Sequence, residues 1–188
     1  MCSVNNETFD IEFIQRTLGN INAKGRPPYQ ITMLVNCLLG LVVLPFEMDV
    51  SNRRKIKLFN KNIVDVPIIK ELTKDEYFHP TSYDRAQGRF KSKPLTIYNL
   101  LKCIRNSIAH HRIYCLPEDG KWRSVRLYDI QDKYTQDNVN GGKPHLELEI
   151  VWTIKQLRAF CDFVCEAYLF EAHSRPDVRL VPLDAWRD

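Results

Sequence analysis

The sequence has few glycines and lacks the local motifs of several large enzyme classes. Only seven glycines occur in 188 residues, and no glycine-rich loop for nucleotide phosphates is present. An H-E-x-x-H zinc motif is also missing, and none of the six cysteines forms a C-x-x-C pair. These absences argue against a nucleotide-dependent enzyme and against a zinc site.

The sequence also has no large excess of positive or negative charge and no long apolar run. The net charge of +4 is far from that of a strongly basic protein, so any RNA contact must rest on local patches. The most apolar segment, Ile31 to Phe46, is interrupted by Asn36 and closed by Pro45, and it is shorter than the roughly 20 residues of a bilayer span. It predicts a buried helix, at the centre of a bundle or in a subunit interface, and no membrane contact.

Four cysteines lie in apolar helical stretches, where free thiols behave as small hydrophobic side chains. These are Cys37, Cys103, Cys161 and Cys165. They predict buried, reduced thiols in preference to disulfides or metal ligands. No basic and apolar leader with a cleavage site opens the sequence, so a reducing cytoplasmic location is expected.

The composition, 44% hydrophobic and 27% charged, excludes general intrinsic disorder. The patterns predict one domain over residues 1–188 with a mainly α fold, a helical bundle that carries a small inserted β-hairpin. Core helices are expected at about 6–46 and 94–173, and a tail at 174–188 is expected to cross the surface. A short helix is predicted within 64–72, with Pro67 in its first turn.

The hairpin is expected in the second half of the chain. Segments 122–130 and 145–152 alternate apolar and polar residues, as half-buried strands do. On the second of them, Glu147 and Glu149 share the polar face and are expected to be exposed to solvent. Thr153 predicts the cap of a final long helix. The core stripe of that helix comprises Leu157, Phe160, Val164 and Tyr168.

The most informative segment is Leu100 to Arg112, LLKCIRNSIAHHR, within a helix predicted to begin at Pro94. With about 100° per residue, Arg105, Asn106 and His110 point away from the apolar stripe, and Arg105 and His110 are about 140° apart. One helix therefore cannot enclose a phosphate between them, and a symmetric second copy of the chain is expected to complete the site. The stripe comprises Ile97, Leu101, Ile104 and Ile108.

These three side chains suit phosphodiester chemistry, because a guanidinium neutralises phosphate charge and an imidazole transfers protons near pH 7. A purely structural explanation is open as well. His110, His111 and Arg112 lie at the predicted helix end, where the helix dipole favours cations. The string R-N-x-x-A-H favours the chemical interpretation, since it is expected by chance in roughly one in a thousand chains of this size.

The motif resembles the signature of the HEPN superfamily, helical domains with an arginine, a polar residue and, after four to six intervening residues, a histidine. The resemblance covers the helix at 94–112 and the general helix pattern around it. It implies a metal-independent endoribonuclease formed by a dimer whose two motif helices face each other across a cleft. Arg105 and His110 would be the catalytic pair, with Asn106 orienting them. HEPN toxins paired with nucleotidyltransferase antitoxins place a tyrosine two residues after the histidine; that position is Arg112 here, and the nearest tyrosine is Tyr114.

Two basic clusters are candidates for RNA contact, although most charge runs are solvated faces. The first cluster comprises Arg53, Arg54, Lys55, Lys57 and Lys61. The second cluster lies directly before the motif helix, contains Phe90 and comprises Arg85, Arg89, Lys91 and Lys93. The second is the stronger candidate because it leads into the motif, and His111 and Arg112 complete the predicted RNA contacts.

The sequence therefore predicts a metal-independent endoribonuclease of HEPN type that cleaves RNA by 2′-hydroxyl attack. No cofactor and no metal are expected, because carboxylates do not cluster near the motif in the sequence. The predicted partners are an RNA substrate, a second copy of the chain and a cognate antitoxin or inhibitor, in the bacterial toxin or phage-defence setting that the resemblance implies. The alternative is a non-catalytic HEPN-like module for dimerisation or for nucleotide or RNA binding.

Overall fold

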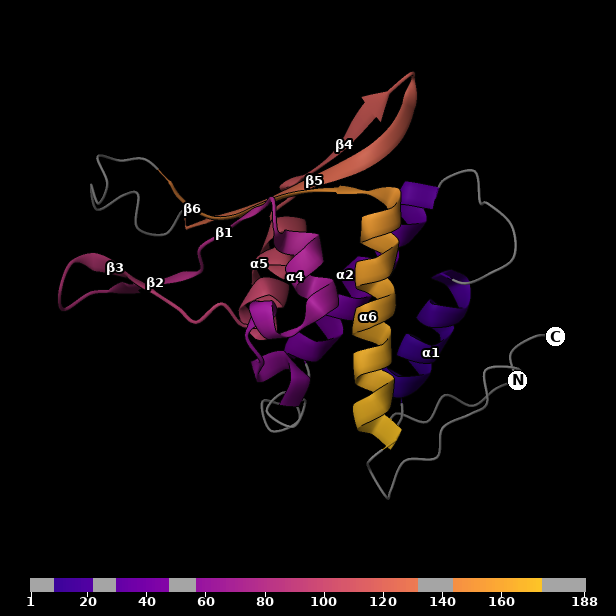
Figure 1. The fold of residues 1–188 in the computed structure, drawn as a ribbon, viewed down its shortest axis with the longest axis horizontal. Helices are drawn as coiled ribbons and strands as arrows, with labels where there is room; N and C mark the ends of the chain where they lie inside the picture. Colours follow the sequence, from indigo (N-terminus) through magenta and orange to yellow (C-terminus); the bar gives the residue numbers. More distant parts are fainter. Residues whose placement is uncertain (1–8, 22–29, 48–56, 132–143, 174–188) are drawn as a thin grey trace. The chain divides into compact units, whose positions relative to one another are not determined.

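Residues 9–21, 30–47, 57–131 and 144–173 are described by the computed structural model of the chain. Internal contacts divide the chain into two units, one of residues 1–56 and 155–188 and one of residues 57–154. The first unit holds the helices α1 (Phe9–Ile21), α2 (Gln30–Glu47) and nearly all of α6 (Ile154–His173) (Figure 1). The predicted tail at 174–188 lies outside the described residues.

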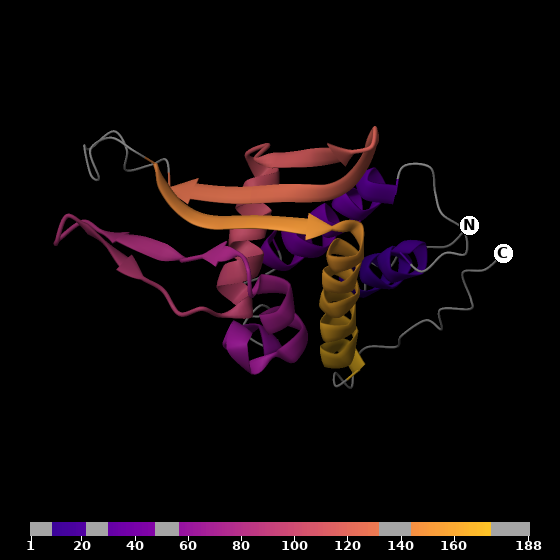
Figure 2. The same cartoon turned by 45° about the horizontal axis from the view of Figure 1, so that its top comes forward.

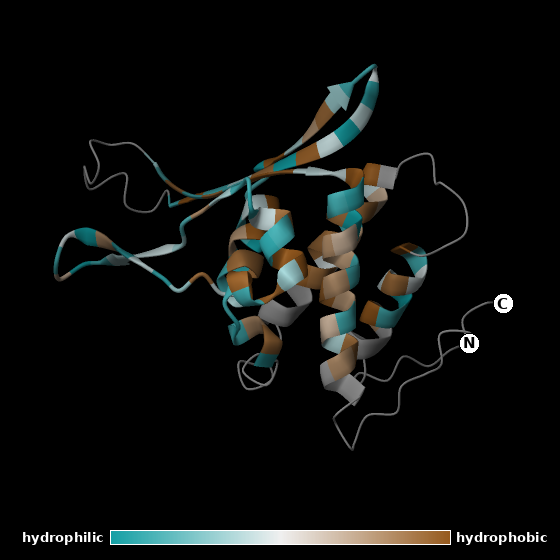
Figure 3. Ribbon diagram, viewed as in Figure 1, coloured by the Kyte–Doolittle hydropathy of each residue, from teal (hydrophilic) through white to brown (hydrophobic). Residues whose placement is uncertain are grey.

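Apolar residues recur along the helices of the first unit (Figure 3), and many of them are buried. The predicted core stripe of α6 is confirmed, since each of its four residues is at most 7% exposed. Helix α2 buries Leu34 and Leu38 completely, but Leu39 is 38% exposed, so one side of this helix remains open. The four cysteines predicted to be buried, reduced thiols are free; Cys103, Cys161 and Cys165 are buried, whereas Cys37 is only half-buried. Among the described helices, none is both long and apolar enough to cross a membrane.

The second unit mixes short helices with strands. Its helical elements are η1 (Lys57–Asn60), η2 (Ile63–Asp65), α4 (Pro67–Thr73) and α5 (Ile97–Ala109). Its strands are β1 (Tyr77–Phe78), β2 (Thr81–Asp84), β3 (Arg89–Ser92), β4 (Ile113–Glu118), β5 (Lys121–Gln131) and β6 (His145–Thr153). Helix α4 confirms the short helix predicted near Pro67, which occupies its first turn.

The strands form two antiparallel sheets. The larger has the strand order β1-β6-β5-β4, and the smaller is the β2–β3 hairpin, which projects beside the β1 edge (Figures 1 and 2). Helix α5 runs across one face of the larger sheet (Figure 2). Trp152 is fully buried on β6, and its indole N–H donates to the Leu72 carbonyl of α4 at 2.8 Å, which fixes α4 to the sheet.

The prediction of a mainly α, HEPN-like bundle with one small inserted hairpin is therefore wrong. The predicted pair of strands exists as β5 and β6, but it forms the centre of a four-stranded sheet, and a second hairpin precedes α5.

The additional strands escaped prediction because each is short or irregular. Strand β1 has two residues and pairs with a strand about 70 positions later, a contact without local sequence signal. Strand β4 contains Pro117, and its register shifts between Leu116 and Pro117. Proline is tolerated there because β4 is an edge strand.

Candidate active site

The motif helix α5 is anchored at its first turn and along one side. The Thr96 hydroxyl accepts the Asn99 backbone N–H at 3.3 Å, as an N-cap does. The predicted stripe is buried, with its residues between 0% and 8% exposed. Arg105 and Asn106 are half-buried, whereas His110 is exposed.

The helix ends in a left-handed turn that places the last motif residues. His111 has a φ of 56°, and its N–H donates to the Ile108 carbonyl at 3.1 Å. The Arg112 N–H donates to the Ser107 carbonyl at 2.7 Å. These two bonds are the Schellman pattern, in which a residue with positive φ reverses the chain after a helix. The turn leaves His110 and His111 exposed and directs Arg112 back toward the sheet.

Asp129 of strand β5 joins the motif residues. Its Oδ2 accepts the Asn106 Nδ2–H at 3.1 Å, and its Oδ1 accepts an Arg112 guanidinium N–H at 3.2 Å. Arg112 also donates to the Ile130 carbonyl at 3.1 Å. On the other side of the amide, an Arg105 guanidinium N–H donates to the Asn106 Oδ1 at 3.4 Å. The structure thus brings Arg105, Asn106 and Arg112 together around one carboxylate.

This carboxylate is buried, with only 2% of Asp129 exposed. Burial raises the pKa of Asp129, and the Glu147 carboxylate acts in the same direction. The hydrogen bond from Asn106 and the charge of Arg112 oppose that rise in pKa because both favour the ionised form. The nearby Cys103 thiol also bonds to Asp129, and burial raises the pKa of Cys103, so the thiol stays protonated at neutral pH.

Strand β6 carries one extra residue relative to β5. Asp129 pairs with Leu148 and the next residue, Ile130, pairs with Leu146, which leaves Glu147 without a partner on β5. A β-bulge of this kind breaks the strict alternation of side chains and re-aims one of them.

The bulge turns Glu147 inward. Glu147 is 4% exposed, and its Oε1 accepts both the backbone N–H and the hydroxyl of Thr81, at 2.7 and 2.6 Å. The prediction that Glu147 faces solvent is therefore wrong. Glu149 lies beyond the bulge and keeps a side chain 35% exposed, paired with Arg126.

The expectation that carboxylates do not cluster near the motif is also wrong. Cys103, Asp129 and Glu147 each offer a ligand atom, and these atoms lie within 4.8 Å of one another. The set fits a metal ion poorly, because its carboxylate oxygens already hold hydrogen-bond donors of the protein. Both oxygens of Asp129 already accept N–H groups, and Glu147 already holds Thr81.

The second basic cluster lies on and just after the β2–β3 hairpin. Arg85, Arg89 and Lys91 are exposed, and Lys91 pairs with Asp84 at 2.5 Å. Lys93 is half-buried, and burial together with the charge of Lys102 lowers the pKa of Lys93. The ring of Phe90 stacks on His145 of β6, with centroids 4.5 Å apart.

The hairpin is fixed to the sheet next to the motif. Besides the Phe90 stack, Thr81 at its base bonds to the buried Glu147, which lies beside Asp129. Of the first basic cluster, Lys57 and Lys61 are exposed, and Arg53, Arg54 and Lys55 lie outside the described residues. Among the described residues, the second cluster is thus joined to the motif through the contacts of its hairpin with the sheet.

The left-handed residue at the helix end leads to a stability prediction. We expect His111→Gly to raise the free energy of unfolding by about 0.5–1 kcal/mol, because glycine adopts positive φ without steric cost. His110→Gly is the matched control: its φ is −100°, so glycine there gains nothing and should lower stability. Urea unfolding of both variants measures the difference, and a loss of stability in His111→Gly would contradict the assigned turn.

Comparison with known protein families agrees with the motif. A family model described as HEPN pEK499 p136 matches residues 1–175. No curated protein and no solved structure showed a significant match. The family model covers nearly the whole chain, α5 and its R-N-x-x-A-H string included, so the chain belongs to the HEPN superfamily.

Proposed function

We propose that this HEPN protein is a metal-independent endoribonuclease that uses the 2′-hydroxyl of its RNA substrate as the nucleophile. The observation that carries the proposal is the placement of R-N-x-x-A-H at the accessible end of α5, in a chain of a family with a matching signature. His110 is exposed at that end, where RNA can reach it.

The proposed roles follow from the chemistry of the side chains. The His110 imidazole accepts the proton of the 2′-hydroxyl as its oxygen attacks the adjacent phosphorus, and an imidazole can also protonate the departing 5′-oxygen. Arg105 stabilises the negative charge that develops on the phosphorane. Asn106 accepts an Arg105 N–H and so orients the guanidinium. The RNA contacts predicted for His111 and Arg112 are part of the same proposal.

The site is proposed to be shared by two copies of the chain. Arg105 is half-buried beside the sheet, and His110 is exposed beyond the last turn of α5. A second motif helix placed opposite would supply the complementary groups. The toxin or phage-defence setting, and a cognate antitoxin or inhibitor, are proposals that rest on family membership.

A non-catalytic HEPN-like module for dimerisation or RNA binding is the second candidate. The ion pair between Arg112 and the buried Asp129 favours its dimerisation form, because a guanidinium paired with a buried carboxylate is less available to RNA phosphates. A protein that binds RNA as a stable dimer without cutting it would fit this second candidate.

The products and the metal requirement of the reaction test the proposal. We expect cleavage to persist in EDTA and to leave 2′,3′-cyclic phosphate and 5′-hydroxyl ends, because the substrate supplies the nucleophile. A matched oligonucleotide with one 2′-deoxy residue at the mapped cleavage position should not be cut there. Dependence on Mg²⁺, or products with 5′-phosphate ends, would exclude this mechanism even if RNA is the substrate.

The β2–β3 hairpin is proposed to hold RNA backbone phosphates. We expect the double change Arg85→Ala and Arg89→Ala to weaken RNA binding for all sequences alike, and to reduce the dependence of log K on log salt by about 0.7 per lost contact. Titration of labelled single-stranded RNA at several salt concentrations measures both effects. Lys70→Ala with Lys74→Ala, two exposed lysines in and directly after α4 and outside the basic clusters, is the control and should leave binding unchanged. An unaltered salt dependence in the arginine variant would show that the hairpin arginines do not contact RNA phosphates.

A further inference from the structure

The side-chain amide of Asn106 lies between a donor, Arg105, and an acceptor, Asp129, and these two partners allow one orientation of the amide. Its oxygen accepts from Arg105, and its nitrogen donates to Asp129. An ionised carboxylate has no proton to donate, so it can bond only to the NH₂ end of an amide. The charge of Asp129, together with the donor-only guanidinium of Arg105, therefore determines which end of the Asn106 amide faces Arg105.

Asp129 holds Arg112 by the same charge. The Arg112 guanidinium donates to the second carboxylate oxygen, and its side chain is 11% exposed. The hydrogen bonds that join Arg105 to Asn106, and Asn106 and Arg112 to Asp129, thus all run from donor to acceptor toward one buried carboxylate. Removing the charge would weaken the hold on Asn106 and would leave Arg112 with its bond to the Ile130 carbonyl.

We propose that Asp129 is a positioning residue of this site, whose carboxylate acts through Asn106 on the orientation of Arg105 and acts directly on Arg112. Asp129 itself is buried and does not touch the RNA. The inference rests on the proposed ribonuclease function and extends it to a strand outside the motif.

The groups that face Asp129 determine how the site responds to pH. They are Cys103 and Asn106 of α5, Arg112 after α5, Glu147 of β6 and, at longer range, Lys93. Burial and Glu147 raise the pKa of Asp129, so its charge is lost on acidification at a higher pH than for an ordinary aspartate. The positioning role requires the ionised form, so protonation of Asp129 should be one cause of slower cleavage at acidic pH.

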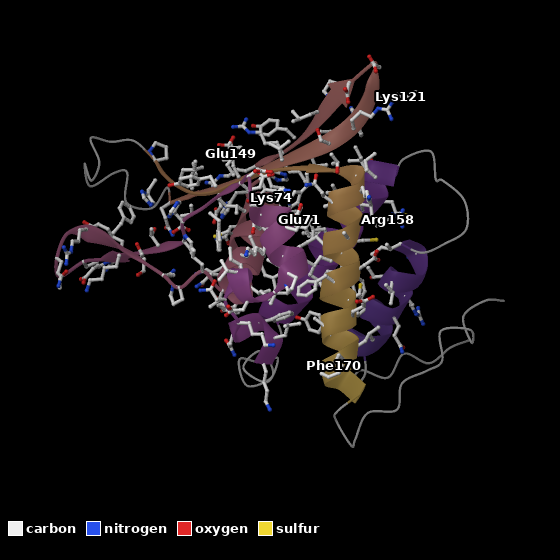
Figure 4. The ribbon with its side chains drawn as sticks, in the orientation of Figure 1. Glu71, Lys74, Lys121, Glu149, Arg158 and Phe170 are labelled. Carbon is white, nitrogen blue, oxygen red and sulfur yellow. The ribbon has the colours of Figure 1, made fainter. Side chains whose placement is uncertain are left out.

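The first test separates positioning from RNA binding. We expect Asp129→Asn to lower the single-turnover cleavage rate at saturating RNA by about 100-fold, the cost of a small misplacement of a reacting group. The Kd of a 2′-O-methyl RNA probe, which cannot react, should stay within a factor of about three, because Arg112 keeps its hydrogen bond to the Ile130 carbonyl. Glu149→Gln is the matched control, because Glu149 lies on the adjacent strand with a partly exposed side chain (Figure 4). A rate equal to that of the parent, or an equal loss of rate and of binding, overturns the proposal.

A second test needs no substitution at Asp129. The side-chain amide signals of Asn106 in NMR spectra, assigned with Asn106→Ala, should shift as Asp129 is protonated. We expect the midpoint of this shift to coincide with the midpoint at which the carboxyl carbon signal of Asp129 itself titrates in the parent protein. Two separate midpoints, or amide signals that do not respond to pH, overturn the proposal even if Asp129→Asn does not fold.

The Asn106 amide signals also distinguish a failure of the ribonuclease proposal from a failure of the positioning role of Asp129. If the parent cleaves no RNA, the ribonuclease proposal fails, and the positioning role is decided by the Asn106 signals in Asp129→Asn. Signals that stay as in the parent overturn it, whereas faster exchange of the amide protons with solvent supports it. Glu149→Gln should leave the signals unchanged.

Discussion

His110→Ala is expected to lower the rate of RNA cleavage by about 100-fold to 10,000-fold, the usual effect of removing a proton-transfer group. The fold should persist, because His110 is exposed and follows the last residue of α5, so its side chain adds little to the core. Cleavage of a labelled RNA under single-turnover conditions gives the rate, and circular dichroism with thermal unfolding monitors the fold.

His111→Ala is a matched control for this experiment, since it removes the same side chain one position later. We expect it to reduce cleavage far less than His110→Ala, because its proposed contribution is phosphate contact and not proton transfer. Arg105→Ala should resemble His110→Ala in its effect on the rate. Parental activity in His110→Ala would refute the catalytic assignment, and unfolding of that variant would support a structural role for the histidine.

The sequence predicted the motif helix well because its signals are local. The apolar stripe of α5 repeats at helical spacing over a short segment, and the buried residues of the structure follow it. The same holds for α6, whose stripe begins at Leu157. Strands β5 and β6 were also predicted, since they are eleven and nine residues long and each contains a run of alternating apolar and polar residues. In all these elements the residues that specify the structure are neighbours in the chain.

The carboxylates beside the motif could not be predicted with equal ease. Glu147 is buried only because β6 has one more residue than β5 at that point, and such a bulge depends on pairing between strands. Asp129 did leave a signal. It follows Val125 and Leu127 at a spacing of two, which places a charged residue on the apolar face of β5. A charge in that position predicts a buried, partnered group.

The four-stranded sheet changes how the motif can be understood. In a purely helical bundle, Asn106 and Arg112 would be surface groups of one helix end. Here the sheet contributes Asp129 to the same network, so the orientation of the motif depends on strand pairing as well as on the helix. The sheet also connects the basic β2–β3 hairpin to this network, through the bonds between Thr81 and Glu147. The β2–β3 hairpin, proposed to bind RNA, and the motif are therefore attached to the same sheet.

Mixing two inactive variants is expected to restore activity if the site is shared between subunits. Arg105→Ala protein retains His110, and His110→Ala protein retains Arg105, so a mixed dimer has one intact site built from both chains. Random exchange of subunits makes half of the dimers mixed, each with one of its two sites intact, and the mixture should reach about a quarter of parental activity.

The mixture is prepared by unfolding and refolding the two variants together, and each variant refolded alone is the control. Cleavage is measured over a range of protein concentrations, with the fraction of dimer determined in parallel by analytical ultracentrifugation. Restored activity should rise and fall with that fraction, because the second helix is required to enclose the phosphate. A mixture that contains mixed dimers and remains as inactive as its components would show that Arg105 and His110 act within one chain, and a monomer that cleaves at full rate would contradict the shared site directly.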